Sequence, residues 1–219
     1  MSSLKEIDII KPKIKRVLDE NFEMDLLLTN DGYLCDFKIV DVTFDIEDEK
    51  RYKFDGCYFY NVDFSESFLE KAEIIDCIFE KCDLSNANLS KSNIYRVIFK
   101  NSKLLGVDFT DSVHKNVSFE DSMIKYANFA YSNLNLVSFK DCDIQNSYLN
   151  DSNVDKVIFD NCNLNLTDFH NTSLKNIDLS NNNIEDIKLE GSELKGAIVS
   201  LSQTMDVARF LGIVIKDNY

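Results

Sequence analysis

The chain has 219 residues, and its 38 acidic and 24 basic side chains give a formal net charge of −14 at pH 7. This balance disfavours direct binding to nucleic acid, whose phosphates attract basic surfaces. No apolar run approaches the roughly 20 residues of a membrane-spanning helix, and the first residues lack the apolar core and cleavage site of a signal peptide. We therefore expect a cytoplasmic protein that contacts neither nucleic acid nor membrane directly.

Residues 1–33 precede any repeating pattern, and we predict that they form an N-terminal cap. The segment 11–21 places a proline in what would be the first turn of a short helix. Residues 24–28 are apolar enough for a strand, and the Asn-Asp-Gly triplet that ends at position 32 is a turn signal. Such a cap would protect an open sheet edge from pairing with other chains.

The main part of the chain is periodic in fives. From Phe54 to Leu194 a bulky side chain recurs at every fifth residue, and of these 29 positions 28 are Phe, Leu, Ile or Val, with His114 as the exception. A second series, two residues before each bulky one, is almost entirely Ala, Ser, Cys, Thr or Val. Neither the helical period of 3.6 nor the strand period of 2 gives this spacing, so the chain is a repeat array.

The five-residue phase begins earlier, at Leu34, and lapses after Phe44. Residues 45–53 are rich in charge and place Glu49 where a bulky apolar residue is due. We predict a repeat domain over 34–199, with a charged insertion at 45–53 that protrudes from the first coil.

The last segment, residues 200–219, differs in character. Ser202 suits an N-cap, 203–211 has helical apolar spacing, and Gly212 suits a C-terminal stop. We predict a short helix and a strand over 213–215 that form a homodimer interface, because so much apolar surface rarely stays exposed. A monomeric cap is the alternative. The predicted interface residues are Met205, Ala208, Leu211, Ile213, Val214 and Ile215.

Each unit of the array reads small–x–large–x–x, as in Asn-Ala-Asn-Leu-Ser at 86–90 and Asn-Cys-Asn-Leu-Asn at 161–165. This pattern resembles the pentapeptide repeat family, whose usual consensus is A(D/N)LXX. The resemblance implies an all-β solenoid, a right-handed quadrilateral β-helix in which each unit forms one side and four units form one coil. A tube this narrow has room for one large and one small side chain per side, so the other residues of each unit face outward.

Residues one coil apart should stack on the same side of such a tube. We predict that the heaviest ladder consists of Phe59, Phe79, Phe99, Phe119, Phe139, Phe159 and Leu179.

Five of the six cysteines occupy the small inward position, and Cys35 alone does not. Core packing is the favoured interpretation, because Cys behaves as a small apolar group and a reducing cytoplasm keeps thiols free. Disulfides are an alternative, because Cys57 and Cys77, like Cys142 and Cys162, would lie on neighbouring coils. A metal site is least favoured, since the sequence has no Cys-x-x-Cys motif or Cys/His cluster.

Motifs that carry catalysis are missing from the sequence, which has two histidines and no phosphate-binding loop, zinc signature or nucleophile elbow. A rod with a filled interior also offers no concave pocket for a substrate. We therefore predict no enzymatic activity, no cofactor and no metal. At His114 we expect a buried neutral imidazole bonded to a corner carbonyl, and the alternative is a kink that redirects the outer surface.

Three features resemble the Qnr group of fluoroquinolone-resistance proteins: the uninterrupted repeat, the charged insertion after Phe44 and the tail Ala-Arg-Phe-Leu-Gly-Ile-Val-Ile at 208–215. The resemblance implies a dimeric acidic rod that imitates DNA, binds DNA gyrase and topoisomerase IV, and protects them from quinolones. The second, larger loop of some Qnr proteins has no counterpart here. The resemblance implies partner contacts in the insertion at Glu47, Asp48, Glu49, Lys50 and Arg51.

The acidic charge is concentrated towards the end of the array, where residues 141–199 hold 11 acidic and 4 basic side chains. Over 54–199 the counts are 23 and 13, a net charge of −10. This is about half the roughly 20 charges of duplex DNA over a 34 Å rod. We predict an acidic wall that binds a topoisomerase. The alternatives are a surface that only confers solubility, a scaffold for another partner, and an immunity factor against a gyrase-targeting peptide toxin. The predicted wall residues are Asp141, Asp143, Asp151, Asp155, Asp160 and Asp168.

Overall fold

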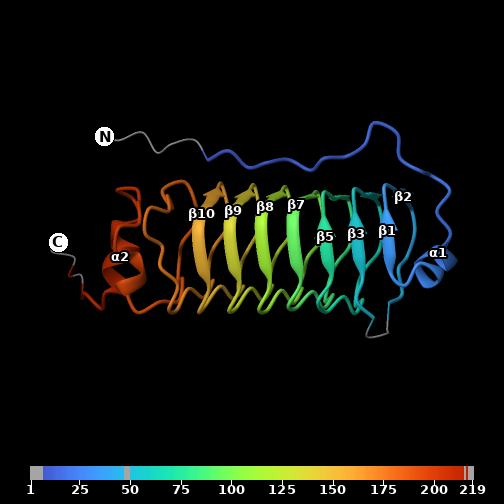
Figure 1. Cartoon of the computed structure of the whole chain (residues 1–219). Helices are drawn as coiled ribbons and strands as arrows, with labels where there is room; N and C mark the ends of the chain where they lie inside the picture. Colours follow the sequence, from blue (N-terminus) through green and yellow to red (C-terminus); the bar gives the residue numbers. More distant parts are fainter. Residues whose placement is uncertain (1–6, 47–49, 215, 217–219) are drawn as a thin grey trace.

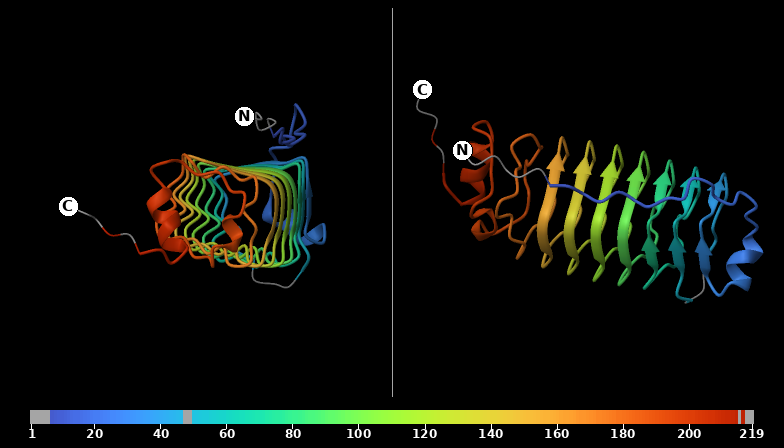
Figure 2. Two further views of the ribbon diagram at one scale, coloured as in Figure 1. Left: turned by 90° about the vertical axis from the view of Figure 1, so that its left-hand side faces the viewer. Right: turned by 45° about the horizontal axis from the view of Figure 1, so that its top comes forward.

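The structure, a computed structural model, describes residues 7–46, 50–214 and 216. Its main body is a rod of parallel strands stacked one coil above another (Figure 1). Viewed along the rod axis, the coils superpose into a four-sided outline (Figure 2). The predicted right-handed quadrilateral β-helix is thereby confirmed. Within the described residues, no helix has the length and apolar character needed to cross a membrane.

Two adjoining sides of the tube carry all the named strands. In the first coils the strands are short, and from the fourth coil they fuse into continuous strands that turn the corner between the two sides. The short strands are β1 (Tyr33–Cys35), β2 (Lys38–Val40), β3 (Lys53–Asp55), β4 (Tyr58–Tyr60), β5 (Glu73–Ile75) and β6 (Ile78–Glu80). The fused strands are β7 (Asn93–Lys100), β8 (Val113–Glu120), β9 (Asn133–Lys140) and β10 (Asn153–Asp160).

Strand register follows the 20-residue coil, as in the parallel pairs Phe99↔Phe119 and Phe119↔Phe139. We number the walls in chain order. Side 1 holds β1, β3, β5 and the first halves of β7–β10, and side 2 holds β2, β4, β6 and the second halves. Side 3 is joined by single bridges such as Asp63↔Asp83, and side 4 by bridges such as Asn88↔Asp108.

The corners of the tube are made by residues in the left-handed backbone region, which recur almost every fifth position from Asp36 onward. Asn, Asp and Gly tolerate this conformation best, and they fill most corners. Leu136 (φ 56°), Leu166 (φ 59°) and Tyr126 (φ 60°) adopt it as well. Coil stacking therefore overrides the local preference, which disfavours such residues by about 1–2 kcal/mol each.

The core consists of the inward residues of both five-residue series. The predicted ladder is confirmed: successive Phe rings from Phe59 to Phe159 stack with centroids 4.7–5.1 Å apart. In the small series, hydroxyls donate to a carbonyl of the preceding coil, as Ser67 Oγ does to Phe44 O at 2.9 Å and Ser147 Oγ to Ile124 O at 2.7 Å. These hydrogen bonds explain why Ser can replace Ala at inward positions.

The cysteines of the small series are buried free thiols, as core packing requires. Their Sγ atoms contact the same backbone carbonyls that the serine hydroxyls use, for example Cys162 Sγ to Phe139 O at 3.3 Å. Cys35, outside the series, is half-buried.

The N-terminal segment differs from its prediction. Residues 7–18, which we call the strap, are extended and run along the outside of the rod (Figure 1), so the helix predicted over 11–21 is wrong. The strand predicted over 24–28 is also wrong, because α1 (Met24–Thr29) is a helix. Only the later residues lie over the first coil, where the Phe22 ring stacks on Phe44 with centroids 5.4 Å apart.

The first coil fills its fourth side with residues outside the five-residue phase. Ile46 and Tyr52, which flank the charged insertion, are 4% and 2% exposed. Of the predicted loop contacts, Lys50 and Arg51 are exposed, whereas Glu47, Asp48 and Glu49 lie outside the described residues.

At the other end, the array closes with a short 3-10 helix η1 (Ser192–Leu194) and the helix α2 (Thr204–Phe210). The predicted helix is confirmed in a shorter form, and Gly212 follows it with φ 71°. The N-cap is Gln203, so the Ser202 prediction is wrong. The Gln203 amide instead donates to Leu179 O at 2.9 Å and Asn182 O at 2.8 Å, which ties α2 to the last coil.

Candidate functional site

The six aspartates predicted to form an acidic wall do not share a wall. Asp155 lies on side 1, Asp160 on side 2, Asp143 on side 3 and Asp168 on side 4. The remaining two, Asp141 and Asp151, are left-handed corner residues. Residues of different five-residue units share a side only when they lie whole coils apart, whereas these six are close in sequence.

Two neighbouring columns nevertheless concentrate negative charge along one edge of the rod, where sides 2 and 3 meet. One column forms the corner itself, and the other forms the adjoining bridges of side 3. Sequence reasoning found Asp141 and Asp143 but missed the other members, which counting in steps of 20 residues would have revealed. We call this set the acidic edge: Asp41, Asp63, Asp83, Asp121, Asp141 and Asp143.

Among the described residues, nearby groups donate hydrogen bonds to five of the six carboxylates of the acidic edge, namely those of Asp41, Asp63, Asp83, Asp141 and Asp143. Corner amides donate along the column, from Asn61 Nδ2 to Asp41 Oδ1 at 2.6 Å and from Asn161 Nδ2 to Asp141 Oδ1 at 2.7 Å. The edge also borders a shallow groove of about 410 Å³ lined by both of its columns near the first coils. The edge therefore presents oriented carboxylates to solvent.

The surroundings of Asp83 favour its charged form. Burial opposes its ionisation, but hydrogen bonds from the Ser85 hydroxyl and N–H and from Lys103 outweigh burial and hold the pKa of Asp83 below its usual value. Lys103 lies 3.3 Å away, and its exposed side chain offsets part of the negative charge at this coil.

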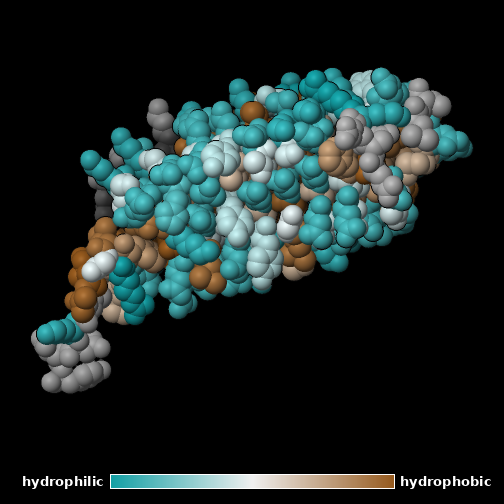
Figure 3. Space-filling view, turned by 90° about the horizontal axis from the view of Figure 1, so that it is seen from below, coloured by the Kyte–Doolittle hydropathy of each residue, from teal (hydrophilic) through white to brown (hydrophobic). Residues whose placement is uncertain are grey.

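The C-terminal end presents a separate apolar surface. Met205, Leu211, Ile213 and Val214 are 56%, 54%, 54% and 85% exposed, and Leu201, which precedes α2 in the chain, is 88% exposed. Ala208 is half-buried. Ile213 and Val214 form no strand, contrary to the prediction, and Ile215 lies outside the described residues. Figure 3 shows this segment as a hydrophobic extension of a largely hydrophilic rod.

His114 is a polar group inside the core. Its ring is fully buried in the large inward slot, and Nε2 lies 2.8 Å from Ser112 Oγ rather than from a corner carbonyl. Burial lowers the pKa of His114 to about 3, so the imidazole is neutral. The parallel ladder continues unbroken from Ile94 through His114 to Leu134, so the residue causes no kink. No group of His, Cys, Asp and Glu side chains within the described ranges is arranged to hold a metal ion.

Among solved structures, the chain is similar to several proteins, among them the following three. HetL of the cyanobacterium Nostoc sp. strain PCC 7120, involved in heterocyst differentiation regulation, is 15% identical, with 77% of this chain and 90% of HetL covered and a TM-score of 0.49. QnrB1, a plasmid-mediated fluoroquinolone resistance protein, is 20% identical, with 84% and 100% covered and a TM-score of 0.33. A thylakoid lumen protein of Arabidopsis thaliana is 20% identical, with 53% and 68% covered and a TM-score of 0.29.

A comparison with curated protein sequences found no match. The family model described as "Pentapeptide repeat region" matches residues 52–129 and 129–199, which together span more than half of the chain. These stretches coincide with the coils whose inward positions recur in fives. The chain belongs to the pentapeptide repeat family.

Proposed function

We propose that this protein is a non-catalytic binding protein of Qnr type. Its acidic edge occupies the basic DNA-binding surface of a type II topoisomerase, DNA gyrase or topoisomerase IV, and thereby protects the enzyme from quinolones. The observation that carries the proposal is a rigid rod with aligned carboxylates along one edge. From Leu34 to Leu174 one inward column rises through seven steps of 20 residues, roughly 34 Å at about 4.8 Å per coil.

Charge and shape contribute differently to this proposal. Duplex DNA has one charge per about 1.7 Å, whereas Asp63 and Asp83 on neighbouring coils stand about 4.8 Å apart along the axis. The edge therefore cannot displace DNA by charge density alone. A rod that is already ordered loses little conformational entropy on binding, which favours it over a flexible acidic tail.

The test is DNA supercoiling by purified gyrase in the presence of ciprofloxacin. Restored supercoiling at low protein concentration is the expected result. If the protein inhibited supercoiling and did not rescue it from ciprofloxacin, its function would be restricted to occupation of the enzyme. If it changed supercoiling neither with nor without ciprofloxacin, topoisomerase binding would be contradicted and a scaffolding role favoured.

The apolar end of the rod supports a homodimer, in which two copies bury Met205, Leu211, Ile213 and Val214 against each other across a twofold axis. Leu211→Asp should halve the mass measured by light scattering, because it places a charge in an apolar interface. Lys195→Asp changes an exposed residue outside this surface and should leave the mass unchanged. A wild-type protein that already has the monomer mass would contradict the dimer.

A further inference from the structure

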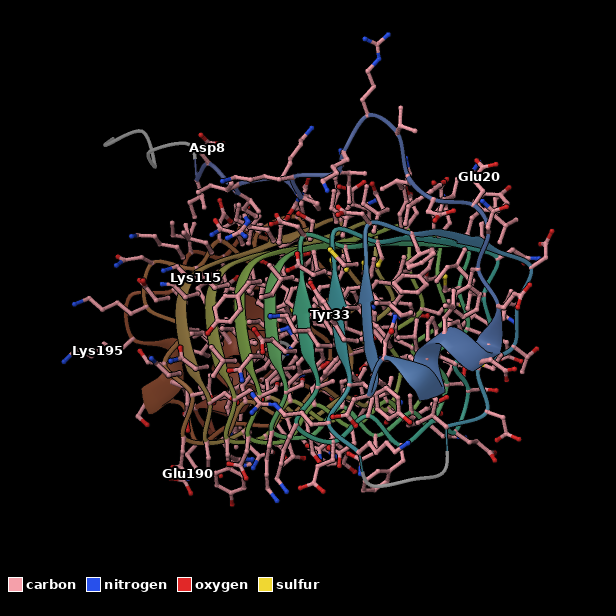
Figure 4. All side chains as sticks on the ribbon, turned by 45° about the vertical axis from the view of Figure 1, so that its right-hand side comes forward. Asp8, Glu20, Tyr33, Lys115, Glu190 and Lys195 are labelled. Carbon is pink, nitrogen blue, oxygen red and sulfur yellow. The ribbon has the colours of Figure 1, made fainter. Side chains whose placement is uncertain are left out.

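The strap meets the rod along one line, the corner between sides 1 and 2. It runs from Asp8, two residues beyond the contact of Ile10 with the coil of Asn116, to Glu20 beside the first coil (Figure 4). Ile7, Ile9, Pro12 and Ile14 are half-buried, whereas the residues between them are exposed. The two pairs alternate with a period of two, and the phase shifts by one residue between Ile9 and Pro12; such alternation is typical of an extended segment with one face on a surface.

Two backbone N–H groups of the strap bind side chains of the corner. Lys13 N donates to Asp76 Oδ1 at 2.9 Å, and Ile10 N donates to Asn116 Oδ1 at 3.1 Å. The two donors are three residues apart, about 10 Å of extended chain, and the two acceptors are two coils apart, also about 10 Å. An extended polypeptide along this corner is therefore in register with the coils.

The acceptors are buried and fixed. Asp76 and Asn116 are 8% and 5% exposed, and both adopt the left-handed conformation of the corner. Arg96 donates to both carboxylate oxygens of Asp76, each at 2.6 Å. Burial opposes ionisation of Asp76, but the bonds from Arg96 and Lys13 N hold its pKa below the usual value. The corner thus presents ready acceptors for the main chain of an extended segment.

Side chains of the strap match the wall beside this corner. Ile14 and Leu18 lie over the outward residues Tyr58, Ile78 and Ile98 of side 2, around a groove of about 490 Å³ that they leave partly open. The strap carries four basic residues and one acidic residue, and Lys15 Nζ lies 2.5 Å from Asp36 Oδ2. Glu80 and Glu120 also line the groove.

We propose that this wall is a binding site for an extended polypeptide segment of a partner, in which aliphatic side chains alternate with Lys or Arg, and that the strap is its exchangeable occupant in the same chain. Asp76 and Asn116 bind the main chain of the segment, and Tyr58, Ile78 and Ile98 hold its aliphatic side chains. The strap forms no strand pairing in 7–18, and its ion pair at Lys15 is largely exposed, so its attachment is weak enough for exchange. The site lies across side 2 from the acidic edge and does not depend on the proposed function.

The test uses the full chain with a site-specific protease sequence inserted after Arg16, next to Val17, which is 81% exposed. After folding and cleavage, a fluorescent peptide of residues 7–18 should replace the cut strap and show raised anisotropy. The uncut chain should not bind the peptide, because its own strap has an effective concentration in the millimolar range. A peptide with the four basic residues changed to Glu should not bind.

Asn116→Leu should weaken peptide binding about tenfold, since it removes one acceptor of a main-chain hydrogen bond. Leu136 already occupies this corner one coil on at φ 56°, so the substitution suits the backbone. Asn101→Leu, at a corner away from the strap with φ 49°, is the matched control and should change binding less than twofold.

Three results would overturn the proposal: loss of β-sheet circular dichroism after cleavage, a cut strap that does not exchange with peptide, and equal affinity in the two Leu variants. The uncut chain could also have the mass of a dimer. If Asn116→Leu abolished that dimer and Leu211→Asp did not, the occupant would be the strap of a second copy, which would also contradict the stated partner.

Discussion

Replacing Phe119 with alanine is expected to lower the free energy of unfolding by about 3–5 kcal/mol. The side chain is fully buried, and its ring stacks between Phe99 at 5.0 Å and Phe139 at 4.8 Å, with interplanar angles of 9° and 4°. The backbone around it is fixed by ladder hydrogen bonds on both neighbouring coils. The tube therefore cannot collapse around the cavity, which places the loss at the upper end for large-to-small substitutions.

Urea denaturation followed by circular dichroism measures this loss, with Phe68→Ala as the matched control. Phe68 is a half-buried outward residue of side 4, so the same chemical change should lower stability by only about 1 kcal/mol. Equal losses in the two variants would contradict the assignment of inward and outward positions.

The second large effect is a pH dependence that originates at His114. Burial lowers the pKa of His114 to about 3 in the folded state, against 6.5 for an unperturbed imidazole. Between these values the unfolded chain binds a proton that the folded chain excludes, so stability falls as the pH drops from 6.5 towards 3. Above pH 6.5 both states are neutral and the effect vanishes. The slope from this group is about 1.4 kcal/mol per pH unit at most.

His114→Leu should remove that slope, and comparison with the wild type cancels the carboxylates that titrate in both proteins. The variant should also be more stable at pH 7, because His114 Nδ1 is buried without a hydrogen-bond partner and Leu134 fills the same column. Denaturation midpoints measured from pH 7 to pH 4.5 test both expectations. Parallel pH profiles of wild type and variant would contradict them.

The five-residue period was sufficient to predict the core, because each inward residue is set by its place in the unit and stacks on its equivalent one coil away. It could not predict how irregular sides are filled. Ile46 and Tyr52 enter the core at the first coil, and Glu193 is 5% exposed where the phase would bury Ser192. These positions depend on contacts with neighbouring coils and not on local sequence.

Two predictions, the helix over 11–21 and the acidic wall, were wrong for physical reasons. The helix predicted over 11–21 was based on Pro12 in its first turn, whereas the burial of Ile7, Ile9, Pro12 and Ile14 is that of an extended chain on a surface. Its hydrogen bond from Ile10 to Asn116 spans 106 residues, a distance that no local pattern encodes. The acidic wall was sought among residues near in sequence, whereas a solenoid aligns residues a whole coil apart.

The acidic edge can be neutralised without altering the backbone. When the six aspartates are changed to Asn, the side chains at positions 63 and 83 keep the Oδ1 atom that accepts a hydrogen bond from the backbone N–H two residues later. Asn61 and Asn101 already occupy the corner column. A control with the same change in charge places six Asp→Asn substitutions on sides 1 and 4 and at the corner between these two sides. The control residues are Asp55, Asp108, Asp111, Asp151, Asp155 and Asp168.

Gyrase supercoiling in ciprofloxacin with these two variants tests the central claim most directly. Wild type and control are expected to restore supercoiling at similar concentrations, and the edge variant should require at least about tenfold more protein, because it has lost the carboxylates that meet the basic surface. Equal rescue by the edge variant, or no rescue by the wild type, would contradict the account.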